Sequence, residues 1–287
     1  MLILLGSIAF FAFVTTPMPT ELDEEFFRSQ MNELDRQRGT IEAAGQKPIS
    51  IVFIGTSRLK NVTFDPAEVS ATAKAVGVNR PVANIVLAIN WAGFERFGPA
   101  LKMIEARRPD VVVVMPEFFV EDFSSAARAR IGIRYLQAKF WNRNFTVFSR
   151  TEFHGHSCDG FSQTVEHRLD SHRRWAMSGS QLRGPTLARN AIRRLSNLGA
   201  KIYITDVPVS KPMMALRVGP LANPRFLSES GPAGVDNVRI IRMAQPYDQS
   251  AYCDWAHIDP SGARLWQRDF FRAIAGDLNR LPARFPD

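Results

Sequence analysis

Short runs of β-branched and other apolar residues alternate with helical stretches along most of this chain. The runs occupy residues 50–55, 82–87, 110–115, 201–205 and 237–242. Helical patterns lie between them, notably over residues 94–107 and 186–198, and Pro109 and Gly199 supply breaks after these helices. Strands that alternate with helices predict a parallel sheet. We therefore expect an α/β fold: a doubly wound sheet of about five parallel strands with helices on both faces.

The length of the chain, 287 residues of which 45% are apolar, suffices for one α/β domain with additional segments. We divide it into residues 1–19, 20–48 and 49–287. The middle segment is a charged helical linker that spaces the domain or packs on it. The last segment is the α/β domain, with an insert at about residues 118–185.

The first 14 residues are apolar or small, and no charge precedes Glu21. A membrane-spanning helix needs about 20 apolar residues, and a signal peptide has a basic start and a cleavage site that this segment lacks. We expect residues 1–19 to be an uncleaved hydrophobic anchor or signal-anchor. A buried N-terminal core helix is the alternative.

An acid and an imidazole, Asp254 and His257, lie three residues apart near the C-terminus. Directly after them Asp259 is a good N-cap and Pro260 suits the first helical position, so a rigid helix start holds their loop. A carboxylate so close can orient the histidine and stabilise its protonated form, as general-base catalysis requires. A surface loop with a stray histidine is the alternative.

A serine follows the first predicted strand, in the sequence Gly55-Thr56-Ser57. The carboxyl end of a first parallel strand is a suitable place for a nucleophile in an open sheet. A serine that forms a turn or caps a helix is the alternative. Together with Asp254 and His257, Ser57 predicts a nucleophile, base and orienting acid.

These motifs resemble those of the SGNH (GDSL-like) hydrolases and acyltransferases over roughly residues 49–280. Gly55-Thr56-Ser57 is similar to the first block of the family, and Asp254-x-x-His257 is similar to its last block. The resemblance implies a flavodoxin-like, SGNH-type sheet. It also implies Ser57 as the nucleophile, His257 as the general base and Asp254 as the residue that orients His257.

The middle blocks of the family match less well. The third predicted strand runs into Met115-Pro116-Glu117-Phe118, where the family has Gly-x-Asn-Asp, so no asparagine occupies that position. We expect the Ser57 N–H and the Asn90 side chain to donate to the oxyanion, with a helix-capping turn as the alternative role of Asn90. Arg58 and Glu117 are the predicted substrate-binding residues.

The net charge is +8, and residues 120–200 carry most of the positive excess. A basic insert suggests an anionic partner, such as an acidic glycan or a membrane surface, and a solvated arginine-rich surface is the alternative. Because no RNA- or DNA-reading module is present, we expect no nucleic acid.

Two cysteines, Cys158 and Cys253, allow one disulfide or two thiols. The histidines of residues 154–159 lack the spacing of a closed zinc site, so we predict no metal and no cofactor.

One anchor before an SGNH-like domain resembles proteins that modify extracellular polysaccharides, such as alginate O-acetyltransferases and teichoic-acid alanylation partners. We expect a serine-dependent acyl-ester hydrolase or O-acyltransferase on the periplasmic or extracytoplasmic side of the cell envelope. Its substrate would be a carbohydrate or another acyl ester, and its partner a membrane O-acyltransferase. A secreted lipase or esterase is one alternative. A catalytically silent module that binds glycan or scaffolds a biosynthetic complex is the other.

Overall fold

The centre of the molecule is one five-stranded sheet. The computed structural model describes residues 20–60, 62, 65–88, 94–119, 186–215, 237–243, 246–254 and 257–282. All strand pairs are parallel, and the order is β2-β1-β3-β4-β5, as in flavodoxin-like sheets. The strands are β1 (Ile49–Gly55), β2 (Val82–Ala88), β3 (Val111–Val114), β4 (Lys201–Thr205) and β5 (Val238–Ile241). The predicted α/β class is confirmed, and each strand ends within one residue of its predicted limits.

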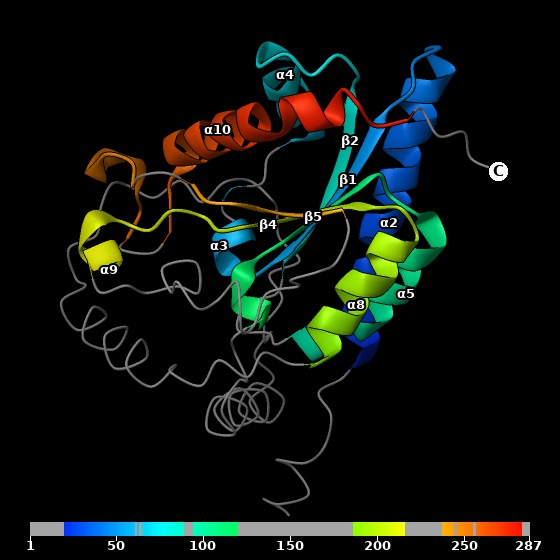
Figure 1. Ribbon diagram of the computed structural model, residues 1–287, viewed down its shortest axis with the longest axis horizontal. Coiled ribbons are helices and arrows are strands. Elements are labelled where there is room, and N and C mark those ends of the chain that lie inside the picture. The colour runs from blue at the N-terminus through cyan, green and yellow to red at the C-terminus, as the bar shows by residue number, and fades with distance from the viewer. Residues whose placement is uncertain are drawn as a thin grey trace, which may run out of the picture.

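Helices cover both faces of this sheet (Figure 1). One face carries α2 (Thr20–Ala43), α5 (Gly98–Arg107) and α8 (Thr186–Asn197). The other face carries α4 (Pro66–Ala75) and α10 (Pro260–Leu278). The shorter elements are α3 (Ser57–Lys60), α9 (Lys211–Ala215), η1 (Phe94–Phe97), η2 (Pro116–Phe119) and η5 (Gln249–Ala251).

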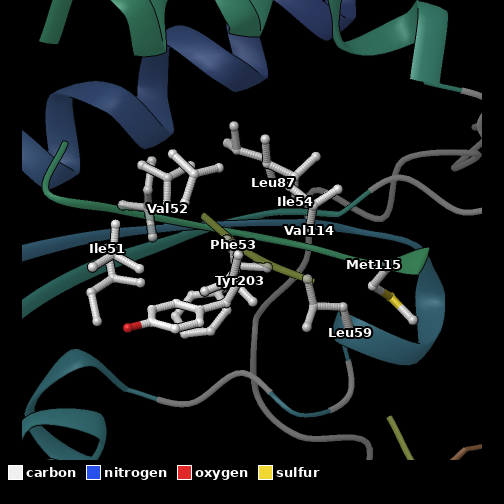
Figure 2. Close-up of a cluster of buried hydrophobic side chains, with 14 of the residues drawn as sticks. Ile51, Val52, Phe53, Ile54, Leu59, Leu87, Val114, Met115 and Tyr203 are labelled. Carbon is white, nitrogen blue, oxygen red and sulfur yellow. The ribbon is translucent and has the colours of Figure 1, made fainter. Parts of the chain in front are cut away.

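Strand β1, which lies between β2 and β3, is buried along its whole length. Val52 and Ile54 point toward the face that α2 and α5 cover, and Phe53 points to the opposite face (Figure 2). There the Phe53 ring lies 6.4 Å from Trp266 and 5.9 Å from Phe270 of α10. Burial on both faces explains why residues 51–54 of β1 are a continuous apolar run instead of an alternating one.

Helix α2 packs on the sheet, which is one of the two roles expected for residues 20–48. Phe27, Met31 and Leu34 are fully buried, at the spacing of one helical face. The Gln37 amide donates to the Asn84 carbonyl at 3.1 Å and accepts from the Asn84 N–H at 2.8 Å. Because β2 is an edge strand, this amide satisfies backbone groups that β1 does not reach.

Helix α4 is not among the helices that we predict from the sequence. It begins at Asp65, whose Oδ1 accepts from the Ala67 N–H at 2.7 Å, with Pro66 in the first turn. Its interior is rich in Ala, Ser and Thr, and of its residues only Val69 and Ala73 are buried. The apolar stripe is therefore too narrow to stand out, although the Asp-Pro helix start was visible.

No helix in the described part of the chain is both long and apolar enough to cross a membrane. The predicted anchor, residues 1–19, and most of the predicted insert, residues 120–185, lie outside the described residues.

The first prediction tests the attachment of α2 to the sheet. Gln37→Met keeps the side-chain size but leaves the Asn84 N–H and carbonyl without their partner. We expect the free energy of unfolding to fall by about 1–3 kcal/mol, because unsatisfied buried polar groups lose their hydration. Urea unfolding measures this loss. The matched control is Gln46→Met at an exposed position after α2, for which we expect a negligible change. Equal effects of the two variants would contradict the role of Gln37.

Candidate functional site

The carboxyl ends of the parallel strands meet at one edge of the sheet, where ligand sites of open α/β folds lie. Ser57 opens α3 there, two residues after the end of β1. Met115 follows β3 at the same edge, and residues 206–210 follow β4. The last turn before α10 reaches this edge as well, through contacts with residues 206–210 described below.

The turn from β1 into α3 requires glycine at position 55. A Cβ on Gly55 would lie 2.5 Å from Leu59 Cδ2 and 2.8 Å from Met115 Sδ. Figure 2 shows Leu59 and Met115 together at this end of β1. Thr56 Oγ1 lies 3.7 Å from the same sulfur. This close packing fixes the path of the backbone that carries Ser57.

Asp254 and His257 form a tight pair. Asp254 Oδ2 lies 2.9 Å and Oδ1 3.1 Å from His257 Nδ1, and Oδ1 accepts from the His257 N–H at 2.8 Å. The side chains are 20% and 28% exposed, respectively, so solvent still reaches the pair. A carboxylate can only accept hydrogen bonds, so Nδ1 carries the proton and Nε2 of the neutral ring is left as the acceptor. This tautomer is the one that a general base needs.

The loop that holds this pair is closed by backbone contacts. Tyr252 and Ile258 form an antiparallel bridge across it, and the Cys253 N–H donates to the His257 carbonyl at 2.9 Å. The acid and the imidazole are therefore held on a short, closed turn.

Helix α10 starts directly after this loop and packs against it. Asp259 Oδ1 accepts from the Gly262 N–H and from Ser261 Oγ, each at 2.7 Å, and Pro260 occupies the first turn. The predicted N-cap is thus confirmed. A Cβ on Gly262 would lie 2.3 Å from the Ala251 carbonyl oxygen, so the helix approaches the loop as closely as glycine allows.

Three elements attach to residues 206–210, the segment after β4. Trp266 of α10 donates to the Asp206 carbonyl at 2.9 Å, and Arg58 of α3 donates to the Val207 carbonyl. The Tyr252 hydroxyl donates to the Val209 carbonyl at 3.1 Å. The turn that carries Ser57 and the turn that carries His257 are therefore tied to the same short stretch of backbone.

The end of β3 supplies packing at the place where the SGNH pattern has a polar donor. Met115 is 1% and Phe118 is 2% exposed. The Phe118 ring lies 5.4 Å from Phe94 and 5.2 Å from Phe97, with edge-on geometry at both contacts. These apolar side chains cannot donate a hydrogen bond to an oxyanion.

The predicted site residues are thus only partly placed. Asp254 and His257 lie together, and the Arg58 guanidinium binds a backbone carbonyl. For Ser57 and Glu117 the structure describes the backbone and not the side chain, and Asn90 lies outside the described residues. The distance from the Ser57 hydroxyl to His257 stays a prediction.

Sequence reasoning did not single out Tyr252, which anchors the acid–base loop. Its partner Val209 is 43 residues away in the sequence, so no local sequence pattern predicts the contact.

Cys253 is disulfide-bonded, and the chain has one other cysteine, Cys158, which lies outside the described residues. Within the described part of the chain no three His, Cys, Asp or Glu side chains form a group that could hold a metal ion. Residues 154–159 lie outside that part.

No family model, curated protein or solved structure matches this chain.

The second prediction compares two glycines of α10. Gly262→Ala should lower the free energy of unfolding by about 1–3 kcal/mol, because the new methyl group meets the Ala251 backbone. Gly276→Ala, whose methyl group would meet nothing closer than Arg280 Nη1 at 3.7 Å, should raise it by about 0.5–1 kcal/mol. Thermal or urea unfolding measures both. An unchanged or raised stability of Gly262→Ala would show that α10 does not pack closely on the acid–base loop.

Proposed function

We propose that this protein is a serine-dependent acyl-ester hydrolase or O-acyltransferase with an SGNH-type domain. The observation that carries the proposal is the Asp254 carboxylate 2.9 Å from His257 Nδ1, on a loop tied to the same backbone segment as the Ser57 turn. A nucleophile, a base and an orienting acid at one sheet edge form the arrangement that acyl transfer requires.

In the proposed first half-reaction Ser57 Oγ attacks the ester carbonyl carbon, and His257 Nε2 takes the hydroxyl proton. The carbonyl oxygen becomes an oxyanion, and Asp254 stabilises the imidazolium through the Nδ1–H. When the oxyanion collapses, the bond between the carbonyl carbon and the leaving oxygen breaks. His257 returns its proton to that oxygen, and the acyl group stays on Ser57.

The second half-reaction decides between hydrolase and transferase. Water or an acceptor hydroxyl attacks the acyl-serine, and His257 takes the proton of the attacking group. The bond between the acyl carbon and Ser57 Oγ then breaks, His257 gives the proton to Ser57 Oγ, and the acyl group leaves as the free acid or as the ester of the acceptor. Both outcomes use the same three residues, so the accessibility of water and of the acceptor determines which one prevails.

Donors to the oxyanion would come from the ends of the first two strands. The Ser57 N–H and the Asn90 side chain are the proposed donors, since the described side chains at the end of β3 are apolar. Arg58 and Glu117 are the substrate-binding residues that the sequence suggests.

The proposed substrate is an acetylated extracellular polysaccharide, favoured by the net charge of +8 if the polymer is anionic. We propose a cell-envelope location on the periplasmic or extracytoplasmic side, with residues 1–19 as the anchor and a membrane O-acyltransferase as a partner.

A silent glycan-binding or scaffold module is the second candidate function. It is favoured by the buried Met115 and Phe118, which leave the third strand end without the polar donor of the SGNH pattern. The Asp254–His257 pair favours the enzyme, because a binding module has no need of an oriented imidazole.

The third prediction separates the two functions. Ser57→Ala and His257→Ala should each lower acetyl-ester turnover by about 10³-fold or more, because the members of such a set act as a unit. Asp254→Asn should retain somewhat more activity. Melting temperatures should change little for Ser57→Ala. The measurement is turnover of a chromogenic acetyl ester by the purified chain, with labelling of Ser57 by a fluorophosphonate located by mass spectrometry.

Ser29→Ala, at an exposed position of α2, is the matched control and should leave turnover and labelling unchanged. If the wild-type protein neither turns over the ester nor is labelled at Ser57, the hydrolase proposal fails and the silent module takes its place.

A further inference from the structure

The segment after β4, residues 206–210, accepts hydrogen bonds from side chains of three different elements. Asp206, Val207 and Val209 each offer their carbonyl to a side chain from a different element. The residue between the last two is Pro208, which has no N–H and a fixed φ, so the segment is stiff. Val207 and Ser210 are almost fully buried. The segment is therefore a rigid point to which other elements are fixed.

Arg58 is the only one of the three donors that sits next to the predicted nucleophile. It belongs to α3, a helix of four residues that is too short to hold its own orientation. Its guanidinium is partly buried and donates to the Val207 carbonyl, 149 residues away in the sequence. A charged donor makes a stronger hydrogen bond than a neutral one. This contact thus supplies the fixation that the short helix lacks.

Tyr252 fixes the opposite half of the site in the same way. Its hydroxyl donates to the Val209 carbonyl at 3.1 Å and accepts from the Tyr247 N–H at 3.0 Å, and the side chain is 1% exposed. Burial raises the pKa of Tyr252, and the Tyr247 N–H and the positive charge of Arg58 act against that rise. Arg58 and Tyr252 therefore donate to carbonyls that are two residues apart on the same segment.

We propose that Arg58 is a positioning residue, which through the rigid carbonyl segment and Tyr252 sets the Ser57 turn against the Asp254–His257 turn. This inference rests on the proposed function, and it replaces the substrate-binding role that the sequence suggested. A nucleophile and its base must lie about 2.6–3.2 Å apart, and a displacement of about 1 Å can cost roughly a hundredfold in rate. Since Ser57 and His257 are 200 residues apart, their spacing depends on such tertiary contacts.

The fourth prediction tests this role with three variants and a control. Arg58→Met removes the donors and the charge, Arg58→Lys keeps the charge, and Tyr252→Phe removes only the hydroxyl. Arg264→Met, at an exposed position of α10, is the control. For acetyl-ester turnover we expect Arg58→Met to lower kcat about 10- to 100-fold with KM within about twofold, since misplacement acts on the chemical step. Arg58→Lys should restore part of kcat, Tyr252→Phe should lower kcat by a smaller factor, and Arg264→Met should match wild type.

A second measurement does not depend on catalysis. Amide hydrogen exchange should become at least about tenfold faster in Arg58→Met over residues 55–60, 206–210 and 252–259 together, because the shared segment loses a tether. Tyr252→Phe should accelerate exchange over the last two ranges, and this milder change keeps the test valid if Arg58→Met does not fold.

The two proposals fail in different ways. A wild-type protein without ester turnover and without Ser57 labelling would end the proposed function, while hydrogen exchange would still report the structural coupling. Faster exchange confined to residues 55–60, or a raised KM at constant kcat, would overturn the positioning role of Arg58. So would a kcat equal to that of wild type.

Discussion

The parallel direction of the five strands decides where reactive groups can gather in this protein. Because every strand points the same way, the turn after β1, the end of β3 and the segment after β4 share one edge of the sheet. The opposite edge has a different character. There Asp110 Oδ2 accepts from the N–H and the hydroxyl of Ser50, at 2.9 and 2.8 Å, and both residues are buried. The amino-end edge thus contains a buried, hydrogen-bonded polar contact, while Asp254 and His257 at the carboxyl-end edge are partly exposed to solvent.

The elements that could be predicted from the sequence are those with a local physical signature. Strands buried on both faces are continuous apolar runs, and α10 begins at an N-cap acid followed by proline. The same signature precedes α4 at Asp65, yet that helix was not predicted because its few buried positions form no visible stripe. The contact of Gln37 with Asn84 on the edge strand β2 could not be predicted either, since neither residue type specifies a partner 47 residues away.

In the candidate site, too, the local contacts could be predicted from the sequence and the long-range contacts could not. The Asp254–His257 pair is predictable because three residues of a closed turn bring the two side chains together. The requirement for glycine at position 55 could not be predicted, because the motif gives no indication that Leu59 and Met115 pack closely against that turn. The contacts of Arg58 and Tyr252 with the segment after β4 could not be predicted either. These contacts join parts of the chain that only the sheet topology brings close together. Sequence therefore identifies candidate groups, and the tertiary contacts decide their spacing.

The apolar end of β3 bears on the rate of the proposed reaction more than on its chemistry. One oxyanion donor is typically worth about 10²–10³ in kcat, whereas the loss of a nucleophile or base forfeits more than that. A site whose donors come only from the first two strand ends would therefore be slower and still use Ser57 and His257 in the same roles. The oriented imidazole of His257 is therefore a stronger argument for an enzyme than the absence of an asparagine after β3 is against it.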